Sequence, residues 1–543
     1  MSRVHLLLPT QTLPHKQLKF PVLGAHSHFN LFLVRTSTKG SISPSPTFEK
    51  LPPVNETVDV EAIAARYKEE REKSLPVDGT YQYQSVDEGF LNHFSKDTWS
   101  EPINRGLVEE TVDFFIVGAC YSGMIPAVRL LQAGITNIKI IDKSSDFGGT
   151  WYWNRYPGAA CDIEAYIYMP LLEETEYVPT EKYARGPELF EHSRRIGRTF
   201  GLYEKTLFQT EVTKLDWNDS VEKWDIGTSR GDKISAQFVT TAAGLLHKMK
   251  FPGVPGIEKF KGHSFHTSRW GFDYTGGDVS GNLHKMTDKR VGIIGTGATA
   301  IQVVPHLGEH SKHLYAFQRT PSSIDVRLDQ PTDLNGQSLS RKALSRTECT
   351  TLTIWIMVNA KMVAETKKAA DPVALTQMIQ KETQTANFNK MDQIRRRVDA
   401  TVKDHKTAEA LKPWYNYVCK RSAFHNAYLP TFKRQNVTLV DTEGRGVERI
   451  TEKGIVFIST CGVEMGSSST NIGKMGCSTT QSALAPNFQH LLNEQAKHIA
   501  FFIAETLRRG VTTVETSEVS EDEWIRTIIR LGRLREGFLR DLL

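Results

Sequence analysis

The sequence predicts an α/β fold with two Rossmann-like domains and a helical insertion. Two segments carry this prediction, at about residues 112–142 and 290–318. Each begins with a short apolar run typical of a buried parallel strand, turns at a loop of small residues, and continues into a helix that leads to a second strand. The third observation is a polar, helix-prone segment at residues 331–415.

Length and composition place the chain among ordinary globular proteins. Its 543 residues are enough for three or four domains at roughly 150 residues each. Hydrophobic residues make up 39% and charged residues 24%, as in a typical soluble enzyme. The net charge of +5 comes from 67 basic and 62 acidic residues, and no basic run stands out, so we expect no nucleic-acid partner.

The six cysteines contain no C-x-x-C pair, so we expect neither a metal site nor a redox disulfide. Scattered cysteines fit a reducing compartment, and the apolar stretches are far shorter than the ~20 residues of a membrane span. A cytoplasmic enzyme is therefore expected. A targeting segment remains open, because the first 48 residues carry basic but no acidic side chains. The sequence does not determine the oligomeric state.

The first βαβ unit carries a degenerate phosphate loop. A dinucleotide fold places G-x-G-x-x-G between strand and helix, so that backbone amides at the helix start meet the pyrophosphate. Gly118 and Gly123 occupy the first and third glycine positions, but Cys120 stands at the second. Asp142 follows the next strand, 24 residues after Gly118, where an acid binds the adenosine ribose. Together these features favour dinucleotide binding over a purely structural turn.

The second βαβ unit carries a complete loop of the accepted G-x-G-x-x-A variant, formed by Gly295, Thr296, Gly297, Ala298, Thr299 and Ala300. Arg319 stands at the end of the following strand, where an NAD-specific site would more often carry an acid. A guanidinium there can clasp a 2′-phosphate, which favours NADPH over NADH. The alternative interpretation of Arg319 is a surface arginine in a loop.

A fingerprint lies between the two loops. Phe260, Gly262, His266 and Trp270 fit the pattern F-x-G-x-x-x-H-x-x-x-W. With the two dinucleotide loops, the chain resembles the Baeyer–Villiger monooxygenases over about residues 60–535. Its overall likeness is to fungal members that act on terpenoid and meroterpenoid ketones. The family usually follows the tryptophan with Pro or Asp, whereas Gly271 follows here.

The resemblance implies the site. FAD and NADPH are the expected cofactors, and a bulky ketone and O2 are the expected substrates, giving an ester or lactone. Arg421 is the expected catalytic cation and Asp162 the residue that positions it. Besides the loop residues, the resemblance implies FAD contacts from Gly149, Thr150, Trp151, Tyr152, Trp153, Ala160, Cys161, Asp162 and Tyr168. It implies NADP contacts from Ile301, Gln302, Arg319, Thr320 and Lys420.

The predicted organisation follows from these motifs. We expect a charged helix at residues 58–77 and a long amphipathic helix at 484–509 that ends at Gly510. The expected domains are a disordered or targeting-like extension at 1–56, an FAD-binding domain at 57–250 and 466–543, an NADP-binding domain at 251–330 and 416–465, and a helical insertion at 331–415.

Several positions depart from the family pattern. Cys120 replaces a glycine, the strand end before the C-terminal part reads Ser459-Thr460-Cys461-Gly462, and family sequence is missing before Gln481. Two alternatives to an active Baeyer–Villiger enzyme therefore stay open. One is a catalytically impaired or non-catalytic paralogue. The other is a flavin N- or S-oxygenase, which Trp270 and Arg421 disfavour.

Overall fold

A computed structural model describes residues 59–74, 83–85, 96–244, 246, 249–332, 372–417, 419–457, 470–474, 488–510 and 526. The expectations for residues 1–56, for the first part of the insertion, for Ser459–Gly462 and for the segment before Gln481 lie outside these residues.

Helices and strands alternate along most of the described chain. The helices are α1 (Val60–Ser74), α2 (Tyr121–Gln132), α3 (Thr150–Trp153), α4 (Ala165–Tyr168), α5 (Gly186–Thr199), α6 (Phe272–Thr275), α7 (Ala298–His310), α10 (Pro372–Thr401), α11 (His405–Leu411), α12 (Tyr428–Thr431) and α13 (Phe488–Arg508). The strands are β1 (Tyr83–Ser85), β2 (Glu109–Val117), β3 (Ile138–Ile141), β4 (Thr206–Leu207), β5 (Val212–Asn218), β6 (Lys223–Thr228), β7 (Lys233–Thr241), β8 (Lys250–Pro252), β9 (Ser264–His266), β10 (Arg290–Ile294), β11 (His313–Gln318), β12 (Ile324–Asp325), β13 (Ala423–Phe424), β14 (Val437–Asp441), β15 (Val447–Thr451), β16 (Gly454–Phe457) and β17 (Thr470–Lys474).

The first sheet has the order β4-β3-β2-β7-β6-β5. The strands β4, β3, β2 and β7 are parallel, and β6 and β5 extend the sheet as an antiparallel meander. The unit β2–α2–β3 is the predicted first βαβ unit, and its helix ends before Gly134, as expected. The Rossmann-like prediction for this part of the chain is confirmed.

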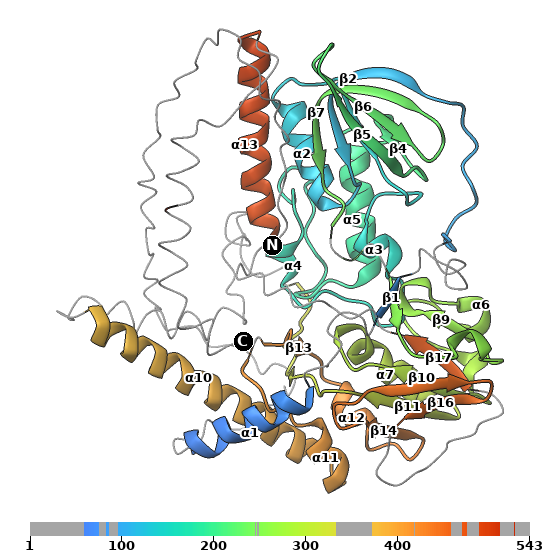
Figure 1. Cartoon of the computed structure of the whole chain (residues 1–543), viewed down its shortest axis with the longest axis vertical. Coiled ribbons are helices and arrows are strands. Elements are labelled where there is room, and N and C mark those ends of the chain that lie inside the picture. Colours follow the sequence, from blue (N-terminus) through green and yellow to red (C-terminus); the bar gives the residue numbers. More distant parts are fainter. Residues whose placement is uncertain are drawn as a thin grey trace. The chain divides into compact units, whose positions relative to one another are not determined.

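The second sheet has the order β14-β11-β10-β17-β9 and is parallel throughout (Figure 1). The predicted strands at 290–294 and 313–318 are β10 and β11. The helix between them, α7, begins at Ala298 in the glycine loop and runs to His310. Pro305 lies inside α7 without ending it.

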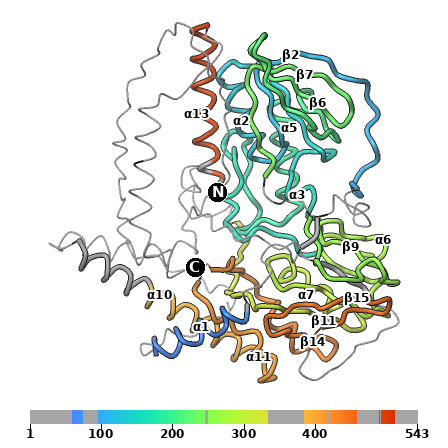
Figure 2. Tube along the Cα trace, viewed as in Figure 1, coloured from blue at the N-terminus to red at the C-terminus, as the bar shows by residue number. Residues whose placement is uncertain are grey.

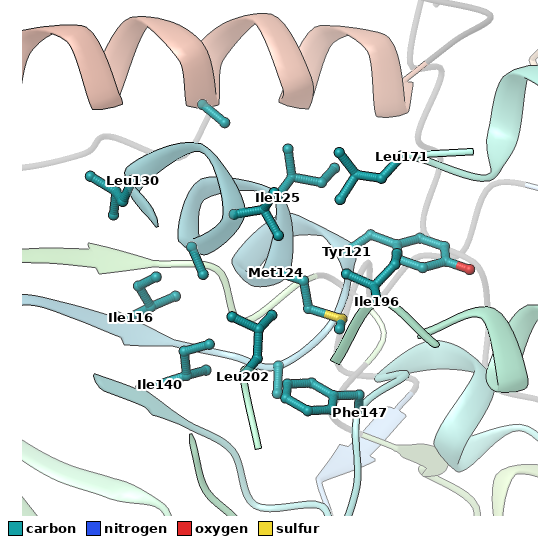
Figure 3. Packing of buried hydrophobic residues seen from close by; sticks show 14 of the residues in the cluster. Ile116, Tyr121, Met124, Ile125, Leu130, Ile140, Phe147, Leu171, Ile196 and Leu202 are labelled. Carbon is teal, nitrogen blue, oxygen red and sulfur yellow. The ribbon is translucent and has the colours of Figure 1, made fainter. Parts of the chain in front are cut away.

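A hydrophobic core joins α2 to α13, which lie side by side although their sequences are more than 350 residues apart (Figures 1 and 3). Ala496, Ala500 and Ile503 of α13 belong to the same buried cluster as the side chains of α2 and β2. Arg129 of α2 also donates to Asn493 Oδ1 at 2.9 Å. The predicted C-terminal amphipathic helix is therefore confirmed, and its apolar face completes the first domain.

Two predicted domain boundaries need correction. Strand β17 was assigned to the FAD-binding domain by the boundary at 465/466, but it pairs with β10 and β9 inside the second sheet. Helix α1 was assigned to the FAD-binding domain as well, but it packs on α10 of the insertion (Figure 2), where the rings of Tyr67 and Phe388 lie 5.5 Å apart. Neither segment carries a motif, so its partner could not be read from local sequence.

Two short segments far apart in sequence meet in a parallel pair. Strand β12 pairs with β13, with Ile324 opposite Ala423 and Asp325 opposite Phe424. Arg327 follows β12 and Arg421 precedes β13, so this pairing brings both arginines to one place. None of the described helices has both the length and the apolar character needed to span a bilayer.

Gly123→Ala should destabilise the first domain. A Cβ at Gly123 would lie 1.9 Å from the backbone oxygen of Gly118, and no side-chain movement can relieve that clash. Alanine is favoured over glycine inside a helix by about 1 kcal/mol. Overpacking costs typically ~1–3 kcal/mol and occasionally more, and a backbone clash lies at the upper end. We expect urea unfolding to show a net loss of about 2 kcal/mol.

Gly106→Ala is the matched control, because no described atom lies within 4 Å of a Cβ built there. Its free energy of unfolding should stay within about 0.5 kcal/mol of the wild-type value. Equal effects of the two substitutions would contradict the close packing of α2 on the first loop.

Candidate active site

The first phosphate loop has the backbone of a dinucleotide site. Gly118 ends β2 with φ +118°, and a Cβ there would lie 2.4 Å from the backbone oxygen of Ala242. Cys120 caps α2 in an extended conformation, φ −93° and ψ −179°. Within the described chain no side chain caps the first turn of α2, so its amides are directed at the position of a phosphate.

The Cys120 side chain occupies the gap between this loop and the Gly148–Gly149 turn. Its thiol donates to Gly148 O at 3.5 Å, and a Cβ built at Gly149 would lie 2.5 Å from Cys120 Cβ. Burial raises the pKa of the Cys120 thiol, so the group is neutral. The loop conformation is therefore kept, but the space in front of it is smaller than a glycine would leave.

Asp142 stands directly after β3, where the sequence placed the ribose-binding acid. Its Oδ2 accepts from Ala119 N at 2.7 Å, and its Oδ1 accepts from Ser144 N at 2.8 Å and Ser144 Oγ at 2.7 Å. The carboxylate thus orders the phosphate loop. Oδ1 already accepts two hydrogen bonds, whereas Oδ2 keeps one lone-pair direction for a further donor. The ribose contact stays a prediction.

The aromatic stretch after Gly149 divides into two groups. The Tyr152 hydroxyl donates to Asp97, and the Trp153 ring lies 3.7 Å below the Arg269 guanidinium. Both side chains are buried. Their expected flavin contacts stay a prediction. Trp151 donates through Nε1 to Tyr168 Oη at 3.1 Å. These two rings and Thr150 also remain candidates for contact with the flavin.

The second loop matches its prediction in backbone. Gly295 has φ +98°, and Gly297 caps α7 in an extended conformation. Ala300 and Ile301, however, lie in the second hydrophobic core. Gln302 Nε2 donates to Ala160 O at 2.9 Å. Its Oε1 accepts from the Tyr156 hydroxyl at 3.0 Å, so this side chain joins two segments of the chain. The NADP contacts expected of Ile301 and Gln302 stay a prediction.

The predicted 2′-phosphate residues come together after β11. Arg319 and Thr320 follow the last residue of β11, and Lys420 Nζ donates to Thr320 O at 3.0 Å and to Pro321 O at 3.1 Å. Thr296 of the glycine loop also donates to Thr320 O, at 3.3 Å. The structure therefore joins the complete loop to two basic residues from segments 100 positions apart.

The two residues of the predicted catalytic pair, Arg421 and Asp162, lie close together as expected. Arg421 Nη2 lies 3.4 Å from Asp162 Oδ2. The Asp162 side chain is 8% exposed, whereas the Arg421 side chain is 48% exposed. Burial raises the pKa of Asp162, and the guanidinium groups of Arg421 and Arg327 oppose this shift. A buried carboxylate thus holds one end of a cation whose other side is open to solvent.

Sequence reasoning missed two arginines at this site. Arg327 lies 4.0 Å from Asp162 through Nη1. Arg397 of α10 is 1% exposed and donates to Ile324 O at 3.0 Å and to His425 O at 3.2 Å. It therefore ties β12 to the end of β13. No fixed spacing marks either residue, and Arg397 lies in a polar helix whose arginines read as surface groups.

Two fingerprint residues, His266 and Trp270, contact other side chains and backbone of the protein. His266 ends β9 and accepts from Ser268 N through Nδ1 at 3.2 Å. Its ring lies 5.4 Å from that of Phe251 in β8. Trp270 is buried and donates through Nε1 to Thr275 Oγ1 at 3.0 Å. Both side chains therefore brace the start of the second domain.

The two loops fit two dinucleotides. Each follows a parallel strand, each opens a helix that described side chains leave uncapped, and one is followed by an acid and the other by an arginine. A buried acid and an open arginine accompany them. Fold and site together define an oxidoreductase with two dinucleotide cofactors.

Comparisons with known proteins give the family. The model of the flavin-binding monooxygenase-like family matches residues 112–397. Neopentalenolactone D synthase of Streptomyces avermitilis is 42% identical, over 89% of this chain and 91% of that protein. A Baeyer–Villiger monooxygenase of Stachybotrys chlorohalonatus is 40% identical, over 89% and 87%. The polycyclic ketone monooxygenase of Thermothelomyces thermophila has a solved structure that matches with a TM-score of 0.72 at 30% identity, covering 83% of this chain and 86% of that one.

The chain therefore belongs to the flavin-binding monooxygenase-like family and, within it, to the Baeyer–Villiger monooxygenases, enzymes whose cofactors are FAD and NADPH.

Asp162→Asn should change stability in a pH-dependent way. Burial raises the pKa of Asp162 above its unfolded value of about 3.9, so its contribution to stability is present below that pH and is lost as pH rises through the folded pKa. Asparagine does not ionise. The free energy of unfolding of D162N relative to wild type should therefore increase as the pH rises from about 4 towards neutrality.

Urea unfolding across this pH range measures the difference. Asp288→Asn is the control, because a hydrogen bond from Lys289 lowers the pKa of the exposed Asp288 and the slope should have the opposite sign. A D162N difference that does not change with pH would show that burial does not oppose ionisation of Asp162.

Proposed function

We propose that this enzyme oxidises a bulky ketone of the terpenoid or meroterpenoid class to an ester or lactone. The observation that carries the proposal is the Asp162–Arg421 pair, a buried carboxylate that holds a half-exposed guanidinium. The balanced reaction consumes the ketone, O2, NADPH and a proton, and yields the ester or lactone, NADP⁺ and water. The name of the polycyclic ketone monooxygenase supports a large substrate.

The chain's own residues would bind, orient and stabilise charge. FAD, once reduced by NADPH, supplies the activated oxygen. Arg421 would stabilise the negative charge that develops on the ketone oxygen, and Asp162 would fix the direction of its guanidinium. Arg319 and Lys420 would bind the 2′-phosphate of NADP, and Asp142 the adenosine ribose of FAD.

A second candidate is a catalytically impaired paralogue. The observation that favours it is the Cys120 side chain, which fills the gap in front of the first phosphate loop. Weak FAD binding would leave the Asp162–Arg421 pair intact but without its cofactor. A flavin N- or S-oxygenase has no observation in its favour beyond the shared family.

We infer the compartment from the cysteines. Cys120 and Cys161 are free thiols in the structure. Because such thiols persist in a reducing environment, we place the enzyme in the cytoplasm.

Arg421→Ala should abolish oxygenation while NADPH still reduces the flavin. Loss of one charge-stabilising group costs roughly 10²–10³ in turnover. Product formation from a polycyclic ketone, followed by mass spectrometry, should fall by that factor, whereas anaerobic bleaching of the flavin by NADPH should change little. Arg445→Ala is the control, because this exposed arginine pairs with the nearby Glu443 on the surface. Undiminished oxygenation by R421A would remove Arg421 from the reaction.

Cys120→Gly should increase flavin content. The substitution removes the side chain that fills the gap beside Gly149, and the loop backbone needs no change because glycine tolerates the extended conformation. The FAD-to-protein ratio after purification, from visible and near-ultraviolet absorption, should rise in the order Cys, Ala, Gly. C120A separates the sulfur from the Cβ. A wild-type chain already saturated with FAD would reject the impaired paralogue.

A further inference from the structure

We propose that Arg327 is a positioning residue for oxygenation: it fixes the Asp162 carboxylate and, through it, the Arg421 guanidinium. The inference rests on the proposed function, because it concerns the same pair. It adds a residue that follows β12 and that neither the motifs nor the family fingerprint marks.

The Arg327 guanidinium is held on the segment that carries Asp162. Nη2 donates to Cys161 O at 3.2 Å and to Tyr183 O at 3.0 Å. Its Cζ lies 5.2 Å from the Tyr183 ring centroid, and its side chain is 11% exposed. One planar group thus binds the backbone immediately before Asp162 and a second loop at once. Because Nη2 donates to both carbonyls while Nη1 faces Asp162 Oδ1, the arrangement uses two nitrogens of one planar group, which arginine has and lysine lacks.

The two arginines face different carboxylate oxygens of Asp162. Arg327 Nη1 lies 4.0 Å from Oδ1, and Arg421 Nη2 lies 3.4 Å from Oδ2. A buried carboxylate is stable in its charged form only when cations or hydrogen bonds compensate for the lost water. Arg421 alone is a weak anchor, because its side chain is half-exposed and solvent screens its charge. Arg327 supplies the second, better buried cation.

The other titratable groups around the pair do not replace Arg327. The Cys161 thiol and the Tyr156 hydroxyl face Asp162, and burial raises the pKa of each to about 12, so both are neutral. On its other side Arg327 faces Asp329, 3.7 Å from Nε, with Glu181 beyond it. His425 also lies near Arg327, and burial lowers its pKa to about 4, so it adds no charge at neutral pH.

The location of Arg327 is itself fixed by the fold. It stands two residues after β12, which pairs with β13 two residues after Arg421. Arg397 donates to the backbone of both segments and keeps them together. The spacing between Arg327 and Arg421 is therefore set by backbone pairing, not by the flexible side chains alone.

The test compares Arg327→Met with Arg327→Lys in the full chain loaded with FAD. With a polycyclic ketone as probe, R327M should lower product formed per NADPH consumed by about tenfold or more, because a misplaced guanidinium no longer meets the substrate. NADPH-driven flavin reduction should change less than about twofold. Arg185→Met, an exposed arginine paired with Glu181, is the matched control and should match wild type.

The pH profile separates positioning from a general structural role. Removing Arg327 removes one of two cations that oppose the effect of burial, so Asp162 should bind its proton at higher pH. The acidic limb of product formation should therefore move up by about one pH unit in R327M. R327K keeps the positive charge but loses the planar group with several donors. The acidic limb of its pH profile should therefore stay near that of wild type, while the product formed per NADPH consumed falls. An unshifted limb in R327M, or equal shifts in both variants, would overturn the proposal.

A measurement that needs no turnover completes the test. In urea unfolding of the purified chain at neutral pH, the shift in midpoint caused by R327M should be smaller in a D162N background than in wild type. Equal shifts would show that Arg327 and Asp162 do not interact. If the wild-type chain loaded with FAD forms no oxygenated product, the proposed function fails; if wild type is active and R421A is inactive but R327M is fully coupled, only the role of Arg327 fails.

Discussion

The buried charge of Asp162 is the constraint on which the arrangement of the site depends. A carboxylate that is 8% exposed needs cations nearby, and the chain supplies them from two segments almost 100 residues apart. Strands β12 and β13 pair to bring these segments together, and Arg397 from the insertion binds both of them. The helical insertion thus has a physical connection to the site: its long helix holds the two strands next to which Arg327 and Arg421 stand.

The stretch from Tyr156 to Asp162 is held by side chains of the second domain. Gln302 of α7 binds the backbone of Ala160 and the hydroxyl of Tyr156, while Arg327 and Arg421 contact the residues that follow. A motif assigned to flavin contact is therefore held in place mainly by residues of the NADP half. Because the same amide and guanidinium groups fix this stretch and its neighbours, a change in the position of one cofactor domain would act directly on the residues around the other.

The sequence predicted what local periodicity and fixed spacing encode. Both βαβ units and the C-terminal helix follow from local periodicity, and the Asp162–Arg421 contact agrees with what the family resemblance implies. What it could not predict depends on non-local pairing. Strand β17 joins the second sheet through partners that carry no motif, and Arg397 is buried in a helix that looks polar throughout. The partners of Tyr152 and Trp153 could not be predicted either, because Asp97 and Arg269 are distant from them in sequence.

The two phosphate loops show what the cysteine changes. Cys120 and Gly297 occupy the same position in their loops, and both are extended, with φ of −93° and −84°. Glycine is therefore not required there by the backbone, since any residue adopts this conformation. What glycine provides at this position is room for the backbone to approach a pyrophosphate. Cysteine at this position leaves the fold of the first domain intact and changes only the space for the cofactor. A correctly folded phosphate loop therefore does not by itself imply that FAD is bound.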